Sequence, residues 1–325
     1  MKKRELLALL RQGRYVSGAE LGEQLGVTRA AVSKAVAGLK REGYDIESIP
    51  NRGHLLRQEP DRLDRDVIRE GLRGHPWAEL VELLPTVDST NTRLKALAAA
   101  GAPQGTVLFA EEQSGGRGRL GRRFLSAPGC GVYLSVLLRP GCRPSELMSL
   151  TAQAAVAARR AVAELCGVEP DIKWVNDLVL KGRKICGILT ELSLEAESGL
   201  VSYAVVGVGV NCNCPAEAFP PELRDVAGSI LSQTGRSVDR NALAAALVRS
   251  LSGLPKLDWL GEYRRACVNL GKEIQILAPG QAARQGVALD VDEQAALLVR
   301  TETGTERIQC GEVSVRGLYS YSPDS

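Results

Sequence analysis

The sequence predicts an α+β protein with a small helical domain at the N-terminus, a central domain built on a mixed sheet and a small β domain at the C-terminus. Three observations support this prediction. Apolar side chains recur at helical spacing in the first 40 residues. Helical and extended patterns mix between about residues 80 and 211, and short strand-like runs follow from about residue 270. A chain of 325 residues is also long enough for two or three domains.

The N-terminal segment is predicted to form three helices and a wing. The first helix carries the apolar residues of the run Leu6–Leu10, and the second begins at the capping box Ser17–Glu20. Gly26 forces a turn, and Thr28 caps the third helix. Two helices joined by a short glycine turn make a helix-turn-helix. The segment Tyr44–Leu56 is then expected to form a β-hairpin.

Charge and side-chain type favour DNA as the partner of this segment. Residues 1–60 hold 11 basic and 7 acidic side chains, whereas the rest of the chain holds 30 basic and 31 acidic ones. The side chains expected to contact DNA are Thr28, Arg29, Ser33 and Lys34 in the third helix and Arg52 at the tip of the wing. The alternative is a dimerisation or scaffold module. A charged linker follows, so the first domain is expected to end near Arg62.

A loop rich in glycine and arginine, Gly115–Arg123, is the most informative feature of the chain. Glycines let backbone N–H groups converge on an anion, and guanidinium groups add bidentate hydrogen bonds. We therefore expect a phosphate-bearing ligand; the alternative is a solvated charge run without fixed structure. Gly116, Gly118 and Gly121 match a dinucleotide-binding pattern, but the strand-like run Val132–Leu138 follows where that fold needs a helix.

Three further motifs lie where predicted strands end. Asp88–Asn91 joins a strand to a helix, and its side chains either cap that helix or face a ligand; for this motif alone, capping is favoured. Asp171–Asp177 leads a strand into a turn, and the return strand of this hairpin begins at Lys184 and contains Gly187. The strand Val205–Asn211 has glycine at alternate positions, which leaves one face bare for a flat ligand or a packed helix.

Cysteine and histidine usage excludes several kinds of site. The eight cysteines lack the spacing of a secreted disulfide framework and are expected to be reduced thiols. Cys212 and Cys214 lack a second pair of zinc ligands, so no protein-ligated metal is expected. No histidine follows His75, which excludes a Ser-His-Asp mechanism in the rest of the chain. Neither a signal peptide nor a membrane-spanning run is recognised, so a cytoplasmic location is expected.

In order and spacing, these motifs closely resemble those of the bifunctional biotin–protein ligases that also repress biotin synthesis. The matching blocks are the helix-turn-helix, Asp88-Ser89-Thr90-Asn91, the Gly/Arg loop, Lys173-Trp174-Val175-Asn176-Asp177, Arg183-Lys184-Ile185-Cys186-Gly187 and Gly207-Val208-Gly209-Val210-Asn211. The resemblance covers nearly the whole chain. It implies a winged helix-turn-helix over residues 1–62, a class II synthetase-like mixed-sheet catalytic domain over 63–268 and a small SH3-like β-barrel over 269–325.

The resemblance also implies roles for individual residues. The residues implied to bind biotin are Ser89, Thr90, Asn91, Gln113, Arg117, Arg119, Lys184, Gly187 and Gly209. Those implied to bind the adenylate are Gly116, Arg117, Gly118, Arg119, Arg122, Phe124, Asn176, Lys184, Asn211 and Arg316. The implied catalytic residues are Lys184, Arg119 and Asp177, and Glu312 and Arg316 in the last strand match ligand-facing residues of the terminal barrel.

The implied activity uses ATP with Mg²⁺ to make biotinyl-5′-AMP and then transfers biotin to a lysine of a biotin carboxyl carrier domain. Adenylylation gives the carboxylate a leaving group that an amine can displace, so the enzyme needs no nucleophile of its own. An adenylate-bound homodimer is implied to bind double-stranded operator DNA and repress biotin genes. The alternatives are a lipoate–protein ligase and a non-catalytic biotin-sensing repressor.

Two positions depart from the residues that are usual in this family. Val175 stands where proline is usual, and Phe124 stands where tryptophan is common. A smaller ring at position 124 implies a smaller stacking contribution to adenylate binding.

Overall fold

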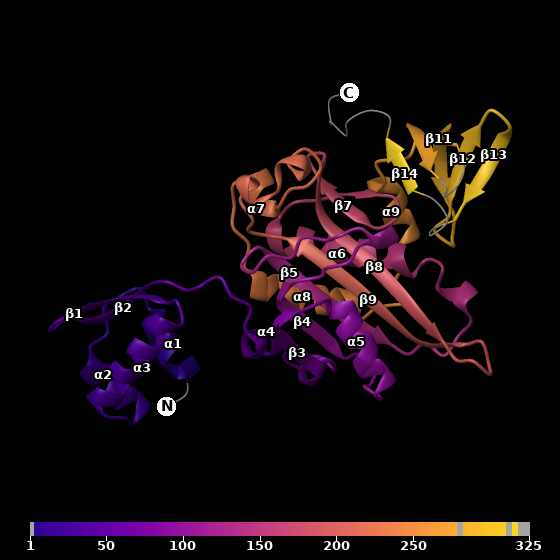
Figure 1. The fold of residues 1–325 in the computed structure, drawn as a ribbon. Coiled ribbons are helices and arrows are strands. Elements are labelled where there is room, and N and C mark those ends of the chain that lie inside the picture. The colour runs from indigo at the N-terminus through magenta and orange to yellow at the C-terminus, as the bar shows by residue number, and fades with distance from the viewer. Residues whose placement is uncertain (1–2, 278–281, 310–313, 318–325) are drawn as a thin grey trace. The chain divides into compact units, whose positions relative to one another are not determined.

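The computed structural model describes residues 3–277, 282–309 and 314–317 (Figure 1). The chain forms two compact units, Met1–Asp61 and Arg62–Ser325. The chain passes from one unit to the other within the charged stretch that follows the wing. The further division at residue 268 stays a prediction.

The N-terminal unit is a winged helix-turn-helix, as predicted. Its elements are α1 (Lys3–Leu10), α2 (Gly18–Leu25), α3 (Arg29–Arg41) and the antiparallel pair β1 (Asp45–Ile49) and β2 (Gly53–Gln58). Ser17 Oγ accepts a hydrogen bond from Glu20 N at 3.0 Å, and Thr28 Oγ1 accepts one from Ala31 N at 3.2 Å, so both predicted caps are present. Gly26 adopts φ 64° between α2 and α3, a conformation that glycine reaches without strain.

A mixed seven-stranded sheet forms the centre of the second unit. Its order is β3-β4-β5-β9-β8-β7-β6, with β3 and β4 parallel and the other neighbours antiparallel. The strands are β3 (Val81–Val87), β4 (Val107–Gln113), β5 (Gly131–Leu138), β6 (Asp171–Lys173), β7 (Asp177–Leu180), β8 (Arg183–Leu194) and β9 (Val201–Asn211). The helices are α4 (Arg65–Gly71), α5 (Thr90–Ala99), α6 (Leu150–Cys166), α7 (Ile230–Thr234), α8 (Arg240–Leu251) and α9 (Leu260–Ala266).

The two faces of this sheet are covered by different helices (Figure 1). α6 and α8 pack on the face that carries Val208 of β9, within the main apolar core. On the other face, Leu94 of α5 packs in a smaller core with Val205. Side chains alternate along a strand, so Gly207 and Gly209 share the α5 face with Val205. That face is therefore left without side chains over part of β9.

The C-terminal residues form a small antiparallel sheet of order β13-β12-β11-β10-β14. Its strands are β10 (Glu273–Leu277), β11 (Arg284–Val291), β12 (Leu297–Thr301), β13 (Gly304–Ile308) and β14 (Ser314–Gly317). This sheet packs against the part of the second unit that contains the central sheet. Trp174 Nε1 donates to Ala295 O at 3.0 Å, and Ile274 belongs to the same core as Trp174. The predicted small C-terminal β domain is thus present.

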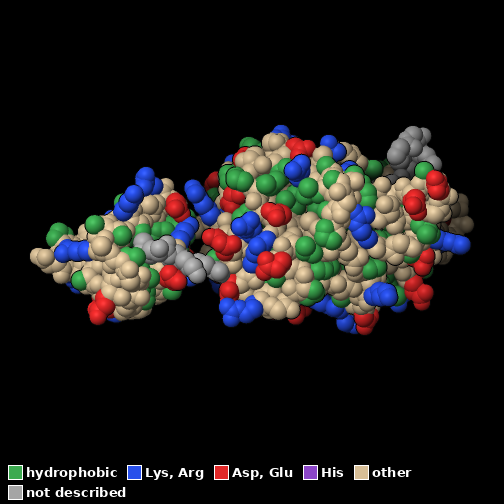
Figure 2. All heavy atoms as spheres, turned by 90° about the horizontal axis from the view of Figure 1, so that it is seen from below, with side chains coloured by type: hydrophobic (Ala, Val, Ile, Leu, Met, Phe, Trp, Pro, Cys, Tyr) green, Lys and Arg blue, Asp and Glu red, His purple; other side chains and the backbone are tan. Residues whose placement is uncertain are grey.

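One face of the second unit carries both signs of charge (Figure 2). On the face shown in Figure 2, basic and acidic side chains of Arg62–Ser325 are interspersed. Among the described residues, none of the helices combines the length and apolar character needed to cross a bilayer.

Candidate active site

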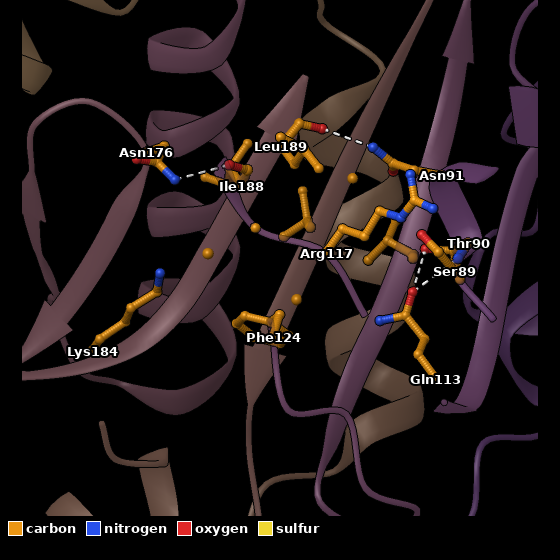
Figure 3. Close-up of a pocket in the computed structure, with 16 residues that line it drawn as sticks. Ser89, Thr90, Asn91, Gln113, Arg117, Phe124, Asn176, Lys184, Ile188 and Leu189 are labelled. Atoms are coloured by element: carbon orange, nitrogen blue, oxygen red, sulfur yellow. Dashed lines mark hydrogen bonds between the residues drawn. The ribbon is translucent and has the colours of Figure 1, made fainter. Parts of the chain in front are cut away.

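One pocket opens on the α5 face of the central sheet and gathers side chains from distant parts of the chain (Figure 3). Its walls come from the start of α5, the end of β4, the Gly/Arg loop, β8 and β9. The lining residues are Ser89, Thr90, Asn91, Gln113, Arg117, Gly118, Phe124, Leu134, Asn176, Lys184, Gly187, Ile188, Leu189, Gly207, Val208 and Gly209. The structure therefore brings together four of the sequence motifs in one cavity.

The polar side chains at the start of α5 do not cap the helix. They contact side chains of neighbouring strands. Ser89 occupies the N-cap position but makes no capping hydrogen bond, so the capping interpretation favoured for this motif is wrong. Instead, Gln113 Oε1 accepts hydrogen bonds from Thr90 N at 2.8 Å and Thr90 Oγ1 at 3.1 Å. Ser135 Oγ lies 2.8 Å from Thr90 Oγ1 and 2.6 Å from Asn91 Oδ1. Ser89, Thr90 and Asn91 all line the cavity, with Thr90 and Asn91 held by Gln113 and Ser135.

Asn91 occupies the space that Gly207 leaves open. A Cβ on Gly207 would lie 2.2 Å from Asn91 Oδ1, so a side chain at that position would displace the amide. Asn91 Nδ2 donates to Leu189 O at 3.1 Å and to Glu191 Oε2 at 2.8 Å. Glu191 in turn is paired with Lys95 of α5. These hydrogen bonds therefore fix the Asn91 amide in the space next to Gly207.

The ring of Phe124 lies on the second bare patch, formed by Gly187 and Gly209. These glycines are partners in neighbouring strands, and a Cβ on Gly209 would lie 2.5 Å from Phe124 Cε1. The glycine face of β9 thus contacts Asn91, from the first turn of the packed helix α5, at Gly207 and the ring of Phe124 at Gly209. Phe124 contacts Tyr133 edge-on at 6.4 Å between centroids. Phe124 is therefore one wall of the pocket.

The Gly/Arg loop is closed by its own backbone. Gly118 N donates to Arg122 O at 2.7 Å, and Phe124 N donates to Gly116 O at 2.9 Å. A Cβ on Gly116 would lie 2.4 Å from Phe124 O, which explains glycine at that position. Arg117 lines the pocket, whereas Arg122 is exposed and is not part of the lining. The loop therefore has a defined turn structure, in contrast to the alternative of a solvated run.

A charged pair lies at the other side of the pocket. Lys184 Nζ lies 2.7 Å from Asp177 Oδ1, and both side chains are partly buried. Asn176 lies beside this pair: its Nδ2 donates to Ile188 O at 3.0 Å, and its Oδ1 accepts from Arg119 Nη1 at 3.3 Å. The backbone of Lys184 is fixed too, because its N–H donates to Val226 O at 2.9 Å. The arrangement supplies a positioned ammonium group next to an amide and a guanidinium.

Gly116, Arg119 and Asp177 contact residues of the pocket but are not among the residues that line it. Three further residues assigned to a ligand lie elsewhere. Asn211 is buried and donates from Nδ2 to Gly228 O at 2.9 Å, outside the pocket lining. Arg316 is placed by its backbone on β14, opposite Gln275 of β10. Glu312 lies outside the described residues.

The sequence analysis missed Ser135, Glu191 and Lys95, which hold the α5 residues in place. Ser135 lies in a strand whose residues are all buried, so neither its type nor its neighbours set it apart. Glu191 and Lys95 are 96 residues apart, and their pairing depends on the fold.

Comparison with known proteins assigns the chain to a family. Residues 83–211 match the biotin/lipoate A/B protein ligase family, residues 2–55 an HTH domain and residues 270–316 the biotin protein ligase C-terminal domain. The bifunctional ligase/repressor BirA of Bacillus subtilis is 30% identical over 96% of this chain and 98% of its own. This chain belongs to the biotin protein ligase family. BirA of Escherichia coli is 31% identical over 96% of both chains.

Solved structures agree with this assignment of the ligase. A biotin protein ligase from Aquifex aeolicus, solved in complex with biotin and ATP, has a TM-score of 0.61 and 30% identity. The match covers 73% of this chain and 98% of that chain. A relative with the same central fold thus binds both biotin and ATP.

The winged helix of the ligase presents most of its assigned side chains to solvent. Arg29, Ser33 and Lys34 are exposed on α3, while the Thr28 hydroxyl is used as the N-cap. Arg52 at the wing tip lies over the ring of Tyr15, with its guanidinium carbon 4.4 Å from the centroid. The basic groups of α3 are therefore available to an anionic partner.

Proposed function

We propose that this ligase uses ATP to form biotinyl-5′-AMP and transfers biotin to a lysine of a biotin carboxyl carrier domain. The observation that carries the proposal is the position of Lys184, whose ammonium lies in a pocket that also holds the polar start of α5. The names of the relatives and the ligands of the Aquifex structure support the same substrates. The ammonium of Lys184 and the polar side chains at the start of α5 suit a reaction that joins an acid to an amine through an adenylate.

Biotin has a ureido ring with hydrogen-bond donors and acceptors at one end and a carboxylate at the other. Thr90, Asn91 and Gln113, whose side chains carry both donors and acceptors, line the α5 end of the pocket; the ureido ring would exchange hydrogen bonds with groups that now bond to one another. In the view of Figure 3, Lys184 lies on the other side of Phe124 from these residues. We assign the α5 end to the ureido ring and the Lys184 end to the carboxylate. Ser89, Arg117, Arg119, Gly187 and Gly209 keep their implied biotin contacts in this assignment.

In the first step, a carboxylate oxygen of biotin attacks the α-phosphorus of ATP and pyrophosphate leaves. Negative charge grows on the phosphoryl oxygens, and a fixed ammonium stabilises it without reorganisation. Lys184 supplies that ammonium. Asp177 holds it in place, and the phosphoryl and carboxylate oxygens of the substrates compete with Asp177 for it. One such preorganised donor is worth about 3–4 kcal/mol of barrier.

In the second step, the amine of the carrier lysine attacks the biotinyl carbonyl carbon and AMP leaves. Asn176 lines the pocket with Lys184, and Asp177 pairs with Lys184; we assign both to face the adenylate and the attacking amine. We assign several further residues to the adenylate. They are Gly116, Gly118 and Arg122 of the Gly/Arg loop, the adjacent Phe124, Asn211 and Arg316. The loop's backbone N–H groups and arginines suit a phosphate, because both donate to anionic oxygens.

Mg²⁺ is expected to enter with the triphosphate of ATP. Among the described residues, no cluster of three or more His, Cys, Asp or Glu side chains could hold a metal alone. Asp177 is a carboxylate in the site, which fits an ion that is held mainly by phosphate oxygens and water. When bound, the ion neutralises phosphate charge.

The test is an acceptor-labelling assay. Purified full-length protein is mixed with ATP, Mg²⁺, biotin and a carrier domain, and the carrier is weighed by mass spectrometry. A biotin mass gain supports the proposal. A gain with lipoate and none with biotin would establish the lipoate–ligase alternative. The absence of any gain, with biotin still bound, would establish the non-catalytic sensor.

A repressor role is proposed for the N-terminal unit. The adenylate-bound protein dimerises on a two-fold symmetric operator of biotin genes, and α3 contacts the double-stranded DNA. Exposed Arg29 and Lys34 support this proposal. Replacing both by alanine removes operator binding in a mobility-shift assay and leaves acceptor labelling unchanged. Arg14→Ala is the matched control, because Arg14 is already paired with Glu20.

A further inference from the structure

Two cysteines far apart in the sequence meet at the turn between the Gly/Arg loop and β5. Cys130 Sγ lies 2.7 Å from Cys214 Sγ. Cys130 belongs to the turn between the Gly/Arg loop and β5, and Cys214 follows the end of β9. β5 and β9 are neighbouring strands, with Gly131 opposite Asn211, so the sheet itself brings the two segments together.

Independent backbone contacts hold each partner. Cys130 O accepts hydrogen bonds from Cys212 N at 2.8 Å and Asn213 N at 2.9 Å. Cys214 O accepts one from Ser229 Oγ at 2.5 Å. The two thiols are therefore positioned by contacts that do not involve sulfur, and joining them would cost little further ordering of the chain.

The remaining cysteine of this region is directed elsewhere. Cys212 is fully buried, and its Sγ lies 3.5 Å from Val210 O of its own strand. Cys130 is partly exposed, whereas Cys214 is buried. A small oxidant can thus reach the pair through Cys130, and Cys214 is the thiol positioned to respond.

We propose that Cys130 and Cys214 form a thiol-oxidation site that a hydroperoxide converts to a disulfide. Both S–H bonds break and one S–S bond forms. The two electrons cleave the O–O bond of hydrogen peroxide, and the two protons complete two molecules of water. A small-molecule dithiol reverses the reaction by thiol–disulfide exchange.

The disulfide connects two segments that border the pocket. One is the turn that follows Phe124, and the other leads from β9 towards Val226, whose carbonyl accepts the backbone N–H of Lys184. Closing the chain between residues 130 and 214 also restricts the unfolded state, so the oxidised protein should unfold at a higher temperature.

The test uses the full-length protein and hydrogen peroxide. After oxidation, free thiols are alkylated, and tryptic peptides are mapped without reduction. The expected result is a cross-linked peptide pair containing Cys130 and Cys214, together with a decrease in intact mass of about 2 Da. Dithiothreitol should restore the original mass and lower the raised melting temperature. Neither readout depends on ligase activity, so failure of the proposed function leaves this test intact.

The matched variants are Cys130→Ser, Cys214→Ser and Cys142→Ser. The first two should abolish the cross-link, and the third, at a partly buried thiol outside the pair, should retain it. If a serine variant fails to fold, the peptide map of the unaltered protein still decides. Retention of all thiols, a cross-link to Cys212, or oxygen addition without a cross-link would each overturn the proposal.

Discussion

Lys184 of β8 and Asp177 of β7 form an ion pair across neighbouring strands, with Nζ 2.7 Å from Oδ1. The pair sits beside Gly187, where a Cβ would lie 3.2 Å from the Lys184 ammonium. A glycine at this point therefore leaves room for the end of the lysine. The carboxylate fixes the ammonium close to the position where the proposed reaction needs positive charge.

The first prediction concerns this ammonium. Lys184→Ala should lower kcat/KM for adenylate formation by about 10²–10³-fold, because one preorganised donor is lost. Pyrophosphate release measures this rate. Lys181→Ala is the matched control: Lys181 lies in the turn before β8 and donates to Gln233 O at 2.8 Å, so its loss should leave the rate nearly unchanged. Equal effects of the two substitutions would remove Lys184 from the site.

The second prediction concerns the glycines of the pocket. Gly207→Ala should weaken biotin binding strongly, because the new Cβ would lie 2.2 Å from Asn91 Oδ1 and displace the amide. Gly187→Ala should have a smaller effect, since its Cβ would meet the Lys184 and Phe124 side chains at 3.2 Å. Titration calorimetry with biotin ranks the two variants. The reverse order would contradict the assignment of Asn91 to the ureido ring.

Local patterns in the sequence were sufficient to predict several features. The helix-turn-helix followed from caps at Ser17 and Thr28, and glycine alternation in β9 indicated a bare face. These signals are local, because a cap or a strand face depends on residues close in the chain. What covers the bare face was beyond such reasoning, since Asn91 and Phe124 reach it from other elements.

The interpretation of Asp88–Asn91 shows a second limit. Ser and Asn are common N-caps, so propensity favoured capping. In the fold, Gln113 of β4 satisfies the N–H of Thr90 from outside the helix, which leaves Ser89 without a capping bond. A contact between residues 23 positions apart therefore decided the role of a motif that looked local.

The third prediction concerns Ser135, which sequence reasoning missed. Its hydroxyl is fully buried and contacts both Thr90 Oγ1 and Asn91 Oδ1. Ser135→Ala should destabilise the protein by about 1–3 kcal/mol, because buried polar partners lose a hydrogen bond. It should also weaken biotin binding. Urea unfolding and calorimetry measure the two effects; Thr151→Ala, which removes a hydroxyl contact to Thr190 outside the pocket lining, should weaken only stability.

The fourth prediction concerns pH and the winged helix. Partial burial lowers the pKa of His54, and the nearby charges of Lys40 and Arg29 lower it further. The unfolded chain therefore takes up a proton at a higher pH than the folded unit does, so stability should fall as pH decreases through about 6.5. His54→Gln should reduce this pH dependence in thermal unfolding of the N-terminal unit. His75→Gln is the control, because His75 lies in the other unit.

The last prediction concerns a buried charge at the turn between the Gly/Arg loop and β5. The Arg240 side chain is fully buried; Nη2 lies 2.8 Å from Glu111 Oε1, and Nη1 donates to Gly131 O at 2.9 Å. The same carboxylate accepts N–H groups from Gly129 at 2.8 Å and Leu63 at 2.9 Å. Arg240 thus pairs with Glu111, and the Glu111 carboxylate fixes both the turn after the Gly/Arg loop and the start of the second unit.

Arg240→Met should cost about 3–5 kcal/mol in urea unfolding, because removing one partner leaves the other charge poorly compensated. Arg249→Met, on the same helix but at the surface, should cost less than about 1 kcal/mol. Adding Glu111→Gln to Arg240→Met should recover part of the loss, since the uncompensated charge is then absent. If the double variant is less stable than Arg240→Met by the full cost of a second independent substitution, the two side chains do not act as a pair.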